Sequence, residues 1–314
     1  MTSFAFVFPG QGSQSVGMLD AWGNHPAVLE TLHEASDALG EDVAKLIREG
    51  PKEALGLTTN TQPVMLVAGV AAWRAWKAEG GADPVAVAGH SLGEYGALVA
   101  AGVLTLAQAA PLVRFRAQAM QEAVPVGTGA MAAILGLDPA RVAEVCAEVT
   151  ASLGGVETAE AVNFNDPGQT VIAGTKAAVD QACVALKAAG AKRALPLPVS
   201  APFHSSLMRP AAEKLRERLA DTPFATPRIP VLNNIDVAFE SAADAIRDAL
   251  YRQAFGPVRW VECIQTLAQR GVAHVVECGP GKVLSGMTKR IDANLVASAI
   301  YDPATLAETK ASLG

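Results

Sequence analysis

The stretch Val85–Tyr95, written VAVAGHSLGEY, places a serine between two glycines directly after a short run that favours a β-strand. Gly89, Ser91 and Gly93 fit G-x-S-x-G, the pattern of a sharp strand-to-helix turn that exposes a nucleophilic serine. A serine that only caps the following helix is the alternative. The preceding strand and the small-residue helix expected after the turn favour the nucleophile. We therefore predict an α/β fold with Ser91 at the carboxyl end of a strand, where such folds place their ligands.

On either side of this turn the chain alternates between short apolar runs and helical patterns. This alternation is typical of a parallel sheet covered by helices. Residues 1–126 and 197–314 are predicted to form one large, discontinuous domain. Its clearest elements are a strand at Phe4–Phe8 and helices at Pro26–Leu39, Gln62–Glu79 and Leu106–Glu122.

Residues 127–196 show a different order of predicted strands and helices. Two strand–helix units and two further strands give the order β-α-β-β-α-β, which is that of a ferredoxin-like unit. We expect this segment to be a separate small subdomain inserted into the large one. Its strands are expected at Ala130–Leu135, Val162–Asn165, Thr170–Ala173 and Lys192–Leu197, with helices from Pro139 and over Lys176–Ala189.

The composition excludes several classes of function. A net charge of −6 and a pI of about 5.4 leave no basic footprint for nucleic acid. The longest apolar stretch, Val64–Trp73, is shorter than the roughly 18–20 residues of a membrane span, and the N-terminus lacks the features of a secretory signal. The cysteines lie far apart without a C-x-x-C pair, so no zinc or redox site is indicated. We expect a cytoplasmic protein that binds no metal, membrane or nucleic acid.

A nucleophilic serine requires a base, for which histidine is the usual residue. His90 is adjacent to Ser91, so its side chain should project elsewhere, although it can line the site. His204 lies in a loop that leaves a predicted strand and precedes a helix, and by elimination it is the best candidate. The other histidines are assigned to the surface (His25 and His33) and to an apolar core strand (His274).

Several ordered motifs extend nearly from end to end of the chain. They are FVFPGQGSQSVGM, TNTQP, GHSLGEY, RAQAMQEAVPVGTGAMAAILGLD, NFNDPGQTVIAG, LPVSAPFHSSLM, PVLNNID and ECGPGKVLSGM. In these motifs the chain resembles the malonyl-CoA:acyl carrier protein transacylases, the stand-alone acyltransferases of bacterial fatty acid synthesis. The resemblance implies an α/β-hydrolase-like large domain and a ferredoxin-like small one, with the active site in the cleft between them.

The resemblance also implies catalytic roles. Ser91 would carry the acyl group and His204 would activate it. The backbone carbonyl of Gln253 would orient the imidazole in place of a carboxylate, so replacement of the Gln253 side chain is expected to have little effect. The backbone N–H of Gln11 would join that of Leu92, which begins the helix after the turn, as an oxyanion donor.

Specificity is expected to come from residues outside the turn. The resemblance assigns Arg116 to the free carboxylate of a malonyl group, and a guanidinium fork suits such a partner. Arg114 points about 200° away on the same helix. Phe203 would crowd an α-methyl branch, which favours an unbranched extender, and His90 would line the site.

The implied partners are malonyl-CoA and an acyl carrier protein whose phosphopantetheine accepts the malonyl group, with no resident cofactor and a monomeric enzyme. Lys187, Lys192 and Arg193 are candidates for a basic patch that meets the acidic carrier. Three alternatives remain open: a serine thioesterase or hydrolase, a non-catalytic binding module that keeps the fold, and an acyltransferase that serves a polyketide or malonate-decarboxylase carrier protein.

Overall fold

A five-stranded parallel sheet forms the centre of the larger of two lobes, in the strand order β7-β2-β1-β8-β9. The computed structural model describes residues 2–199 and 201–314; residue 1 of the predicted large domain and residue 200 of the LPVSAPFHSSLM motif lie outside it. The strands are β1 (Phe4–Phe8), β2 (Ala86–Gly89), β7 (Val231–Leu232), β8 (His274–Cys278) and β9 (Val296–Ile300).

Strand β1 shows why this sheet is buried on both faces. Successive side chains of a strand point to opposite faces. Phe6 packs edge-on against Trp73 and Trp76 of α4 (Thr58–Ala78), with ring centroids 5.5 and 5.4 Å apart. Ala5 and Val7 point the other way, into a second cluster built around α11 (Trp260–Gln269). A strand that is apolar on both faces is typical of a central parallel strand.

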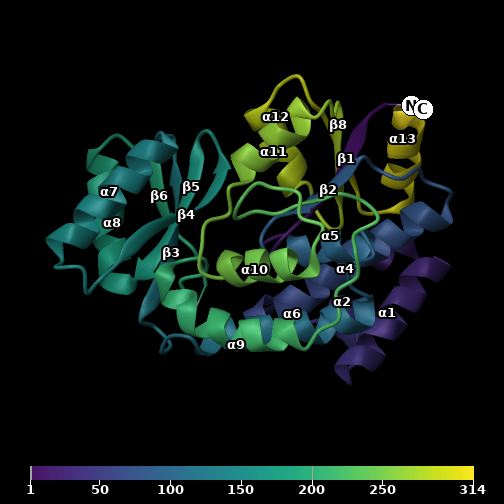
Figure 1. Cartoon of the computed structure of the whole chain (residues 1–314), viewed down its shortest axis with the longest axis horizontal. Helices are drawn as coiled ribbons and strands as arrows, with labels where there is room; N and C mark the ends of the chain where they lie inside the picture. Colours follow the sequence, from purple (N-terminus) through teal and green to yellow (C-terminus); the bar gives the residue numbers. More distant parts are fainter. Residues whose placement is uncertain (1, 200) are drawn as a thin grey trace.

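Helices cover both faces of this sheet (Figure 1). The predicted mixed α/β fold with a parallel sheet is confirmed, and the helices expected at Pro26–Leu39 and Leu106–Glu122 have those bounds. The helices of this lobe are α1 (Pro26–Leu39), α2 (Val43–Glu49), α3 (Lys52–Gly56), α4, α5 (Gly93–Ala100), α6 (Leu106–Glu122), α9 (Arg209–Ala220), α10 (Ala243–Gln253), α11, α12 (Val283–Ile291) and α13 (Pro303–Leu313).

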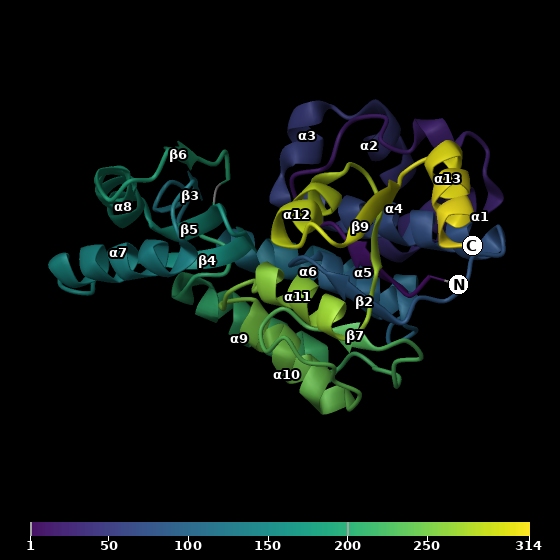
Figure 2. The same ribbon diagram turned by 90° about the horizontal axis from the view of Figure 1, so that it is seen from above.

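A four-stranded antiparallel sheet forms the smaller lobe, residues 129–196, in the order β4-β5-β3-β6. Helices α7 and α8 cover one face, and the lobe lies beside the larger one in both views (Figures 1 and 2). The elements are β3 (Gly129–Leu135), α7 (Pro139–Ser152), β4 (Ala159–Asp166), β5 (Gln169–Thr175), α8 (Lys176–Ala188) and β6 (Arg193–Pro196).

Backbone hydrogen bonds join the two lobes. The N–H of Phe164 in β4 donates to the carbonyl of Val258 at 2.9 Å, and the N–H of Val258 donates to the carbonyl of Val162 at 2.8 Å. Val258 lies just before α11 in the larger lobe. The chain ends also meet, because the N–H of Thr2 donates to the carbonyl of Leu313 at 3.1 Å. Both termini lie on the side of the larger lobe away from the smaller one (Figure 1).

Element ends differ from the prediction in a few places. Helix α4 begins at Thr58 and not at Gln62. The turn that precedes Pro63 is held by the Thr61 hydroxyl, which donates to the carbonyls of Leu55 and Leu57 at 2.7 and 3.0 Å. Within the described ranges, no helix is both long and apolar enough to cross a membrane.

Candidate active site

Ser91 lies on a strained turn between β2 and α5. Its φ is 53°, in the left-handed region that a non-glycine residue adopts at a cost of about 1–3 kcal/mol. A Cβ on Gly89 would lie 1.9 Å from the carbonyl carbon of Gly93, and a Cβ on Gly93 would lie 2.1 Å from the carbonyl oxygen of Phe8. Only glycine fits at either position. The turn therefore has the sharp geometry that the G-x-S-x-G spacing predicts.

His204 faces the serine. The Ser91 hydroxyl and His204 Nε2 are 2.6 Å apart, and His204 Nδ1 is 2.9 Å from the backbone carbonyl of Gln253 at the end of α10. Because a carbonyl only accepts, Nδ1 carries the proton and Nε2 is free to accept from Ser91. Ser91 and His204, which are 113 positions apart, thus form a serine–histidine pair, and Gln253, 49 positions after His204, orients it.

The electrostatics keep His204 neutral. Burial, and to a smaller extent the positive charge of Arg116, lower its pKa to about 3, against the hydrogen bond to Gln253. A neutral imidazole is the form that can take the serine proton. The nearby positive charge makes the imidazolium costly until a negative group enters the site.

Arg116 of α6 lies at the serine and not at the surface. Its side chain is 2% exposed, and its Nη2 donates to Ser91 Oγ at 3.2 Å and to Gln253 Oε1 at 3.1 Å. Its Nη1 donates to Gln62 Oε1 at 2.6 Å. Within the described residues the guanidinium makes no ion pair with a carboxylate, so its partners are amides and a hydroxyl. Next to Ser91, this cation without a carboxylate partner among the described residues has the charge that an anionic ligand would need.

Arg114, two residues earlier, has a different environment. Its guanidinium pairs with Glu41. The predicted divergence of the two arginines around α6 is therefore present, and only Arg116 points into the site.

The Gln253 side chain has contacts that the sequence does not indicate. The small effect expected of its replacement, which rests on the backbone carbonyl that orients His204, stays a prediction. The residue is fully buried, its Oε1 accepts from Arg116, and its Nε2 donates to Ser91 O at 3.1 Å and to Glu94 Oε2 at 2.9 Å. The side chain is part of the site because the carbonyl and the amide of one residue face the same group of residues.

The site opens into a cavity of about 470 Å³ between the two lobes. Gln11 and Leu92 line it, and within the described residues the backbone N–H of neither has an acceptor. The Gln11 side chain is held by the Thr58 hydroxyl, which donates to its Oε1 at 2.8 Å. Leu92 follows Ser91 in the chain and Gln11 lines the same cavity, so their N–H groups are candidates for an oxyanion hole.

Phe203 and His90 also line this cavity. Phe203 is 9% exposed and forms an apolar wall next to His204. His90 Nε2 is 2.8 Å from Asn165 Oδ1 of the smaller lobe, so its ring is turned away from Ser91, as expected. Burial lowers the pKa of His90. His90 is thus a neutral wall residue that joins the lobes.

The remaining histidines lie away from the site. His274 is buried in β8, and its Nε2 contacts Ser298 Oγ at 2.9 Å, which confirms a core histidine. His33 is exposed. The expectation of a surface position for His25 is wrong, because its side chain is only 13% exposed and packs edge-on against Trp22. Within the described residues, no three His, Cys, Asp or Glu side chains are placed to hold a metal.

Two residues that the sequence analysis left without a role hold the turn. Asn234, after β7, accepts from the Ser91 N–H through Oδ1 at 2.8 Å and donates through Nδ2 to Gly89 O at 2.8 Å. Glu94, in the first turn of α5, accepts from the Asn234 N–H at 2.9 Å. The motif that contains Asn234 was noted, but spacing alone gives no signal for a side chain that caps a distant turn.

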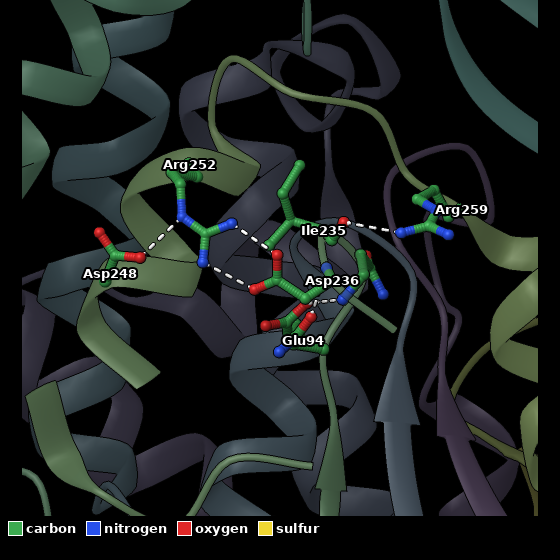
Figure 3. A network of polar contacts seen from close by, with 8 residues as sticks. Glu94, Ile235, Asp236, Asp248, Arg252 and Arg259 are labelled. Atoms are coloured by element: carbon green, nitrogen blue, oxygen red, sulfur yellow. Dashed lines mark hydrogen bonds and ion pairs between the residues drawn. The ribbon is translucent and has the colours of Figure 1, made fainter. Parts of the chain in front are cut away.

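A group of charged residues encloses the segment that carries Asn234 (Figure 3). Arg252 of α10 donates to both carboxylate oxygens of Asp236 at 2.6 Å and to Asp248 at 2.7 Å. Arg259 donates to the carbonyl of Ile235 at 3.4 Å from the other side. The Arg252 guanidinium lowers the pKa of Asp236. These contacts fix the segment relative to α10, whose last residue is Gln253.

Comparison with known sequences places this geometry among acyltransferases. The profile of the acyl transferase domain family matches residues 5–295. A malonyl CoA-acyl carrier protein transacylase of Salmonella typhimurium is 57% identical over 307 residues, which cover 98% of each chain.

Solved structures agree with the sequence comparison. The crystal structure of an acyl-carrier-protein S-malonyltransferase from Burkholderia pseudomallei is 64% identical, with a TM-score of 0.96 over 99% of this chain and 100% of that one. A malonyl-transacylase solved in complex with its type II PKS acyl-carrier protein is 51% identical, with a TM-score of 0.96 over 99% and 100% of the two chains.

Proposed function

The chain belongs to the acyl transferase family, and from this premise we propose how its own residues transfer a malonyl group from malonyl-CoA to acyl carrier protein. The enzyme is an acyl-carrier-protein S-malonyltransferase. The observation that carries the assignment of residues is the meeting of three groups: Ser91 Oγ lies 2.6 Å from His204 Nε2 and 3.2 Å from Arg116 Nη2.

In the first half-reaction, Ser91 attacks the malonyl thioester. His204 Nε2 takes the hydroxyl proton as Oγ bonds to the carbonyl carbon. The backbone N–H groups of Gln11 and Leu92 hold the oxyanion that develops. The carbon–sulfur bond then breaks, and the CoA sulfur leaves with the proton from His204, so that a malonyl ester remains on Ser91.

In the second half-reaction, the phosphopantetheine thiol of the carrier is the nucleophile. His204 takes the thiol proton, and the sulfur bonds to the ester carbonyl carbon. The carbon–oxygen bond breaks, and Ser91 Oγ recovers its proton from His204. The cycle needs only side chains and backbone groups of this chain, and we propose that it uses no resident cofactor.

Arg116 and Phe203 would select the substrate. Two parallel hydrogen bonds from a guanidinium match the free carboxylate of malonyl. The Phe203 ring would crowd a branch on the α-carbon. Phe203→Ala should raise kcat/KM for methylmalonyl-CoA relative to malonyl-CoA by roughly tenfold, since one methyl group is worth about 1–3 kcal/mol. An unchanged ratio of the two kcat/KM values would show that Phe203 does not determine this selectivity.

A thioesterase would use the same serine and histidine, with water ending the cycle. Single-turnover decay of malonyl-Ser91, followed by intact mass with and without carrier protein, separates the two reactions. We expect decay to be at least one hundred times faster with holo carrier protein. Equal rates would identify a hydrolase, and failure of Ser91 to take a malonyl group would identify a binding module.

We propose that the carrier is that of fatty acid synthesis. A polyketide carrier is the second candidate, because the 51% identical malonyl-transacylase was solved with one. Rates of transfer to both carriers, measured side by side, decide between them. Lys187, Lys192 and Arg193 are exposed on α8 and beside β6, and we propose them as the basic docking patch. If charge reversal there left the salt dependence of transfer unchanged, docking would lie elsewhere.

Finer features of the architecture are also proposals. The strand order of the smaller sheet supports a ferredoxin-like subdomain over residues 127–196, and the sharp turn at Ser91 supports an α/β-hydrolase-like large domain over 1–126 and 197–314. We propose a monomer that works in the cytoplasm. Light scattering of the purified protein tests the first statement, and cell fractionation tests the second.

A further inference from the structure

Glu94 is a buried carboxylate that the reaction above does not use. It lies in α5, three residues after the nucleophile, and its side chain is 2% exposed. Charged side chains are rarely buried without a partner that repays their desolvation. The hydrogen-bond partners of Glu94 in the larger lobe therefore indicate its role.

Both hydrogen bonds of Glu94 end on residues that touch the reacting groups. Its Oε2 accepts from Gln253 Nε2 at 2.9 Å and from the backbone N–H of Asn234 at 2.9 Å. Among the residues that the structure describes, the hydrogen bonds of Glu94 toward the substrate site pass through these two residues. It therefore acts on the reaction by holding them.

The bond to Gln253 sets which way the amide faces. A carboxylate oxygen without a proton can only accept, so it selects the NH₂ end of the amide. The oxygen end is left for Arg116, whose Nη2 donates to it at 3.1 Å. A reversed amide would place NH₂ against the guanidinium, donor against donor. The Gln253 amide thus links the anion at Glu94 to the cation that we assign to the malonyl carboxylate.

The bond to Asn234 reaches the nucleophile by a second route. Asn234 uses Oδ1 for the Ser91 N–H and Nδ2 for Gly89 O, so its side chain spans the turn. Its own N–H is directed at Glu94. The segment that carries it is held from outside by Arg252 and Arg259, above Glu94 in the view of Figure 3.

We propose that Glu94 is a positioning residue for malonyl transfer, whose Oε2 fixes the Gln253 amide and thereby the place of Arg116 at the malonyl carboxylate. This inference rests on the proposed function. It also explains why the same residue that orients His204 through its carbonyl has a side chain facing Glu94. One acceptor atom then controls the orientation of both the base and the substrate anchor.

This role requires a hydrogen-bond acceptor at the position of Oε2, and it does not require the full negative charge of the carboxylate. Burial raises the pKa of Glu94 to about 7, against hydrogen bonds from Gln253 and Asn234 and the charge of Arg116. A proton on Oε1 would leave Oε2 as the acceptor. Oε1 itself has no hydrogen-bond partner among the described residues, so the NH₂ group of a glutamine can occupy its position.

A positioning role for Glu94 predicts a definite order of activity among its variants. Glu94→Gln keeps the acceptor and loses the charge, and we expect kcat/KM for malonyl-CoA within threefold of the parent. Glu94→Asp keeps the charge but is one methylene shorter, and Glu94→Leu removes the acceptor. We expect kcat/KM to fall at least thirtyfold in both, and the ratio of malonyl to acetyl transfer to fall at least tenfold, because only malonyl uses Arg116.

Glu277 of β8 provides a matched control. It is also a fully buried carboxylate, its Oε2 accepts from the Ser285 N–H at 2.8 Å, and neither residue lines the cavity. Glu277→Gln and Glu277→Leu should leave the malonyl-to-acetyl ratio unchanged even where the melting temperature falls. Melting temperatures of all variants are measured in parallel, and if Glu94→Leu fails to fold, Glu94→Gln and Glu94→Asp decide.

Several outcomes would overturn the inference. Activity retained by Glu94→Asp and lost by Glu94→Gln would make Glu94 a counterion for Arg116. Equal losses of malonyl and acetyl transfer in Glu94→Asp and Glu94→Leu, in step with melting temperature, would make its role structural. Parental activity in Glu94→Asp or Glu94→Leu would give it no role. If the parent chain itself transfers no malonyl in the same assay, the proposed function fails first.

Discussion

The two lobes contribute unequally to the site. The larger lobe supplies the serine, the histidine, the arginine and the orienting carbonyl, which hydrogen bonds join to one another. The smaller lobe supplies walls: Met131 and Val171 line the cavity, and Asn165 holds His90. The difference indicates that one lobe fixes the chemistry while the other shapes the space around the substrate. The predictions below test this division.

The catalytic pair should give the largest effect. Ser91→Ala and His204→Ala should each lower kcat/KM for malonyl transfer on the order of 10⁴-fold or more, because the nucleophile and its base act as a unit. Intact mass after malonyl-CoA should show no adduct on Ser91→Ala. A malonyl adduct on that variant would place the nucleophile elsewhere.

Arg116→Ala should come next. Truncation of one member of a buried charge pair costs about 2–5 kcal/mol, so malonyl kcat/KM should fall roughly 30- to 4,000-fold. Acetyl transfer should change little, and the malonyl preference should be lost. Arg114→Ala, which removes the neighbouring arginine paired with Glu41, is the matched control and should behave as the parent. Equal losses of malonyl and acetyl transfer would contradict the carboxylate assignment.

The pH dependence should report the neutral His204. Its pKa is lowered from 6.5 to about 3, so labelling of Ser91 by a neutral fluorophosphonate should persist below pH 6.5. In Arg116→Ala the acid limb should move to higher pH, because a positive charge beside the imidazole is gone. An acid limb near 6.5 in the parent would show that His204 is not so perturbed.

Stability should follow the same histidine. Between pH 6.5 and about 3 the unfolded chain binds a proton at His204 that the folded chain does not. The contribution of His204 to the free energy of unfolding should therefore fall as pH drops through this window. Urea titrations of the parent and His204→Ala at pH 7 and pH 5 check this, and the variant should lose less stability between the two values.

The smallest expected effect comes from a direct comparison of one cavity residue from each lobe. Met120 of α6 and Met131 of β3 line the same cavity from opposite lobes and are both buried. Gln62, which holds Arg116, contacts Met120 Sδ at 3.9 Å. Met120→Ala should lower malonyl kcat/KM about tenfold and Met131→Ala less than threefold, although both lose core volume at a cost of about 2–5 kcal/mol. A larger loss of kcat/KM in Met131→Ala than in Met120→Ala would contradict the division of roles between the lobes.

The sequence predicts the turn well because its requirements are local. Two glycines around Ser91, a strand before it and a helix after it specify the geometry in a few residues. The strand at Phe4–Phe8 and the order of strands and helices along the smaller lobe are likewise local patterns. The partners of the turn are different. His204 emerged by elimination, while Arg116 and Gln253 came only from resemblance, because their positions depend on how distant helices pack.

The roles of Asn234, Glu94 and Gln62 could not be predicted from the sequence. Each is an ordinary polar residue in sequence, and each becomes significant only through a contact between segments far apart along the chain. Strand β7 spans only Val231–Leu232 at the sheet edge. The chain turns away after it, and Asn234 then reaches Ser91.

The buried guanidinium of Arg116 has a thermodynamic consequence for the folded protein. The fold encloses a cation and leaves its Nε without a partner among the described residues. A small dicarboxylate would supply the missing anion in the native state alone. By mass action, such a ligand at one hundred times its Kd adds about 2.7 kcal/mol to the free energy of unfolding. The molecule would then be most resistant to heat when its substrate is abundant, so that metabolite supply and enzyme lifetime rise together.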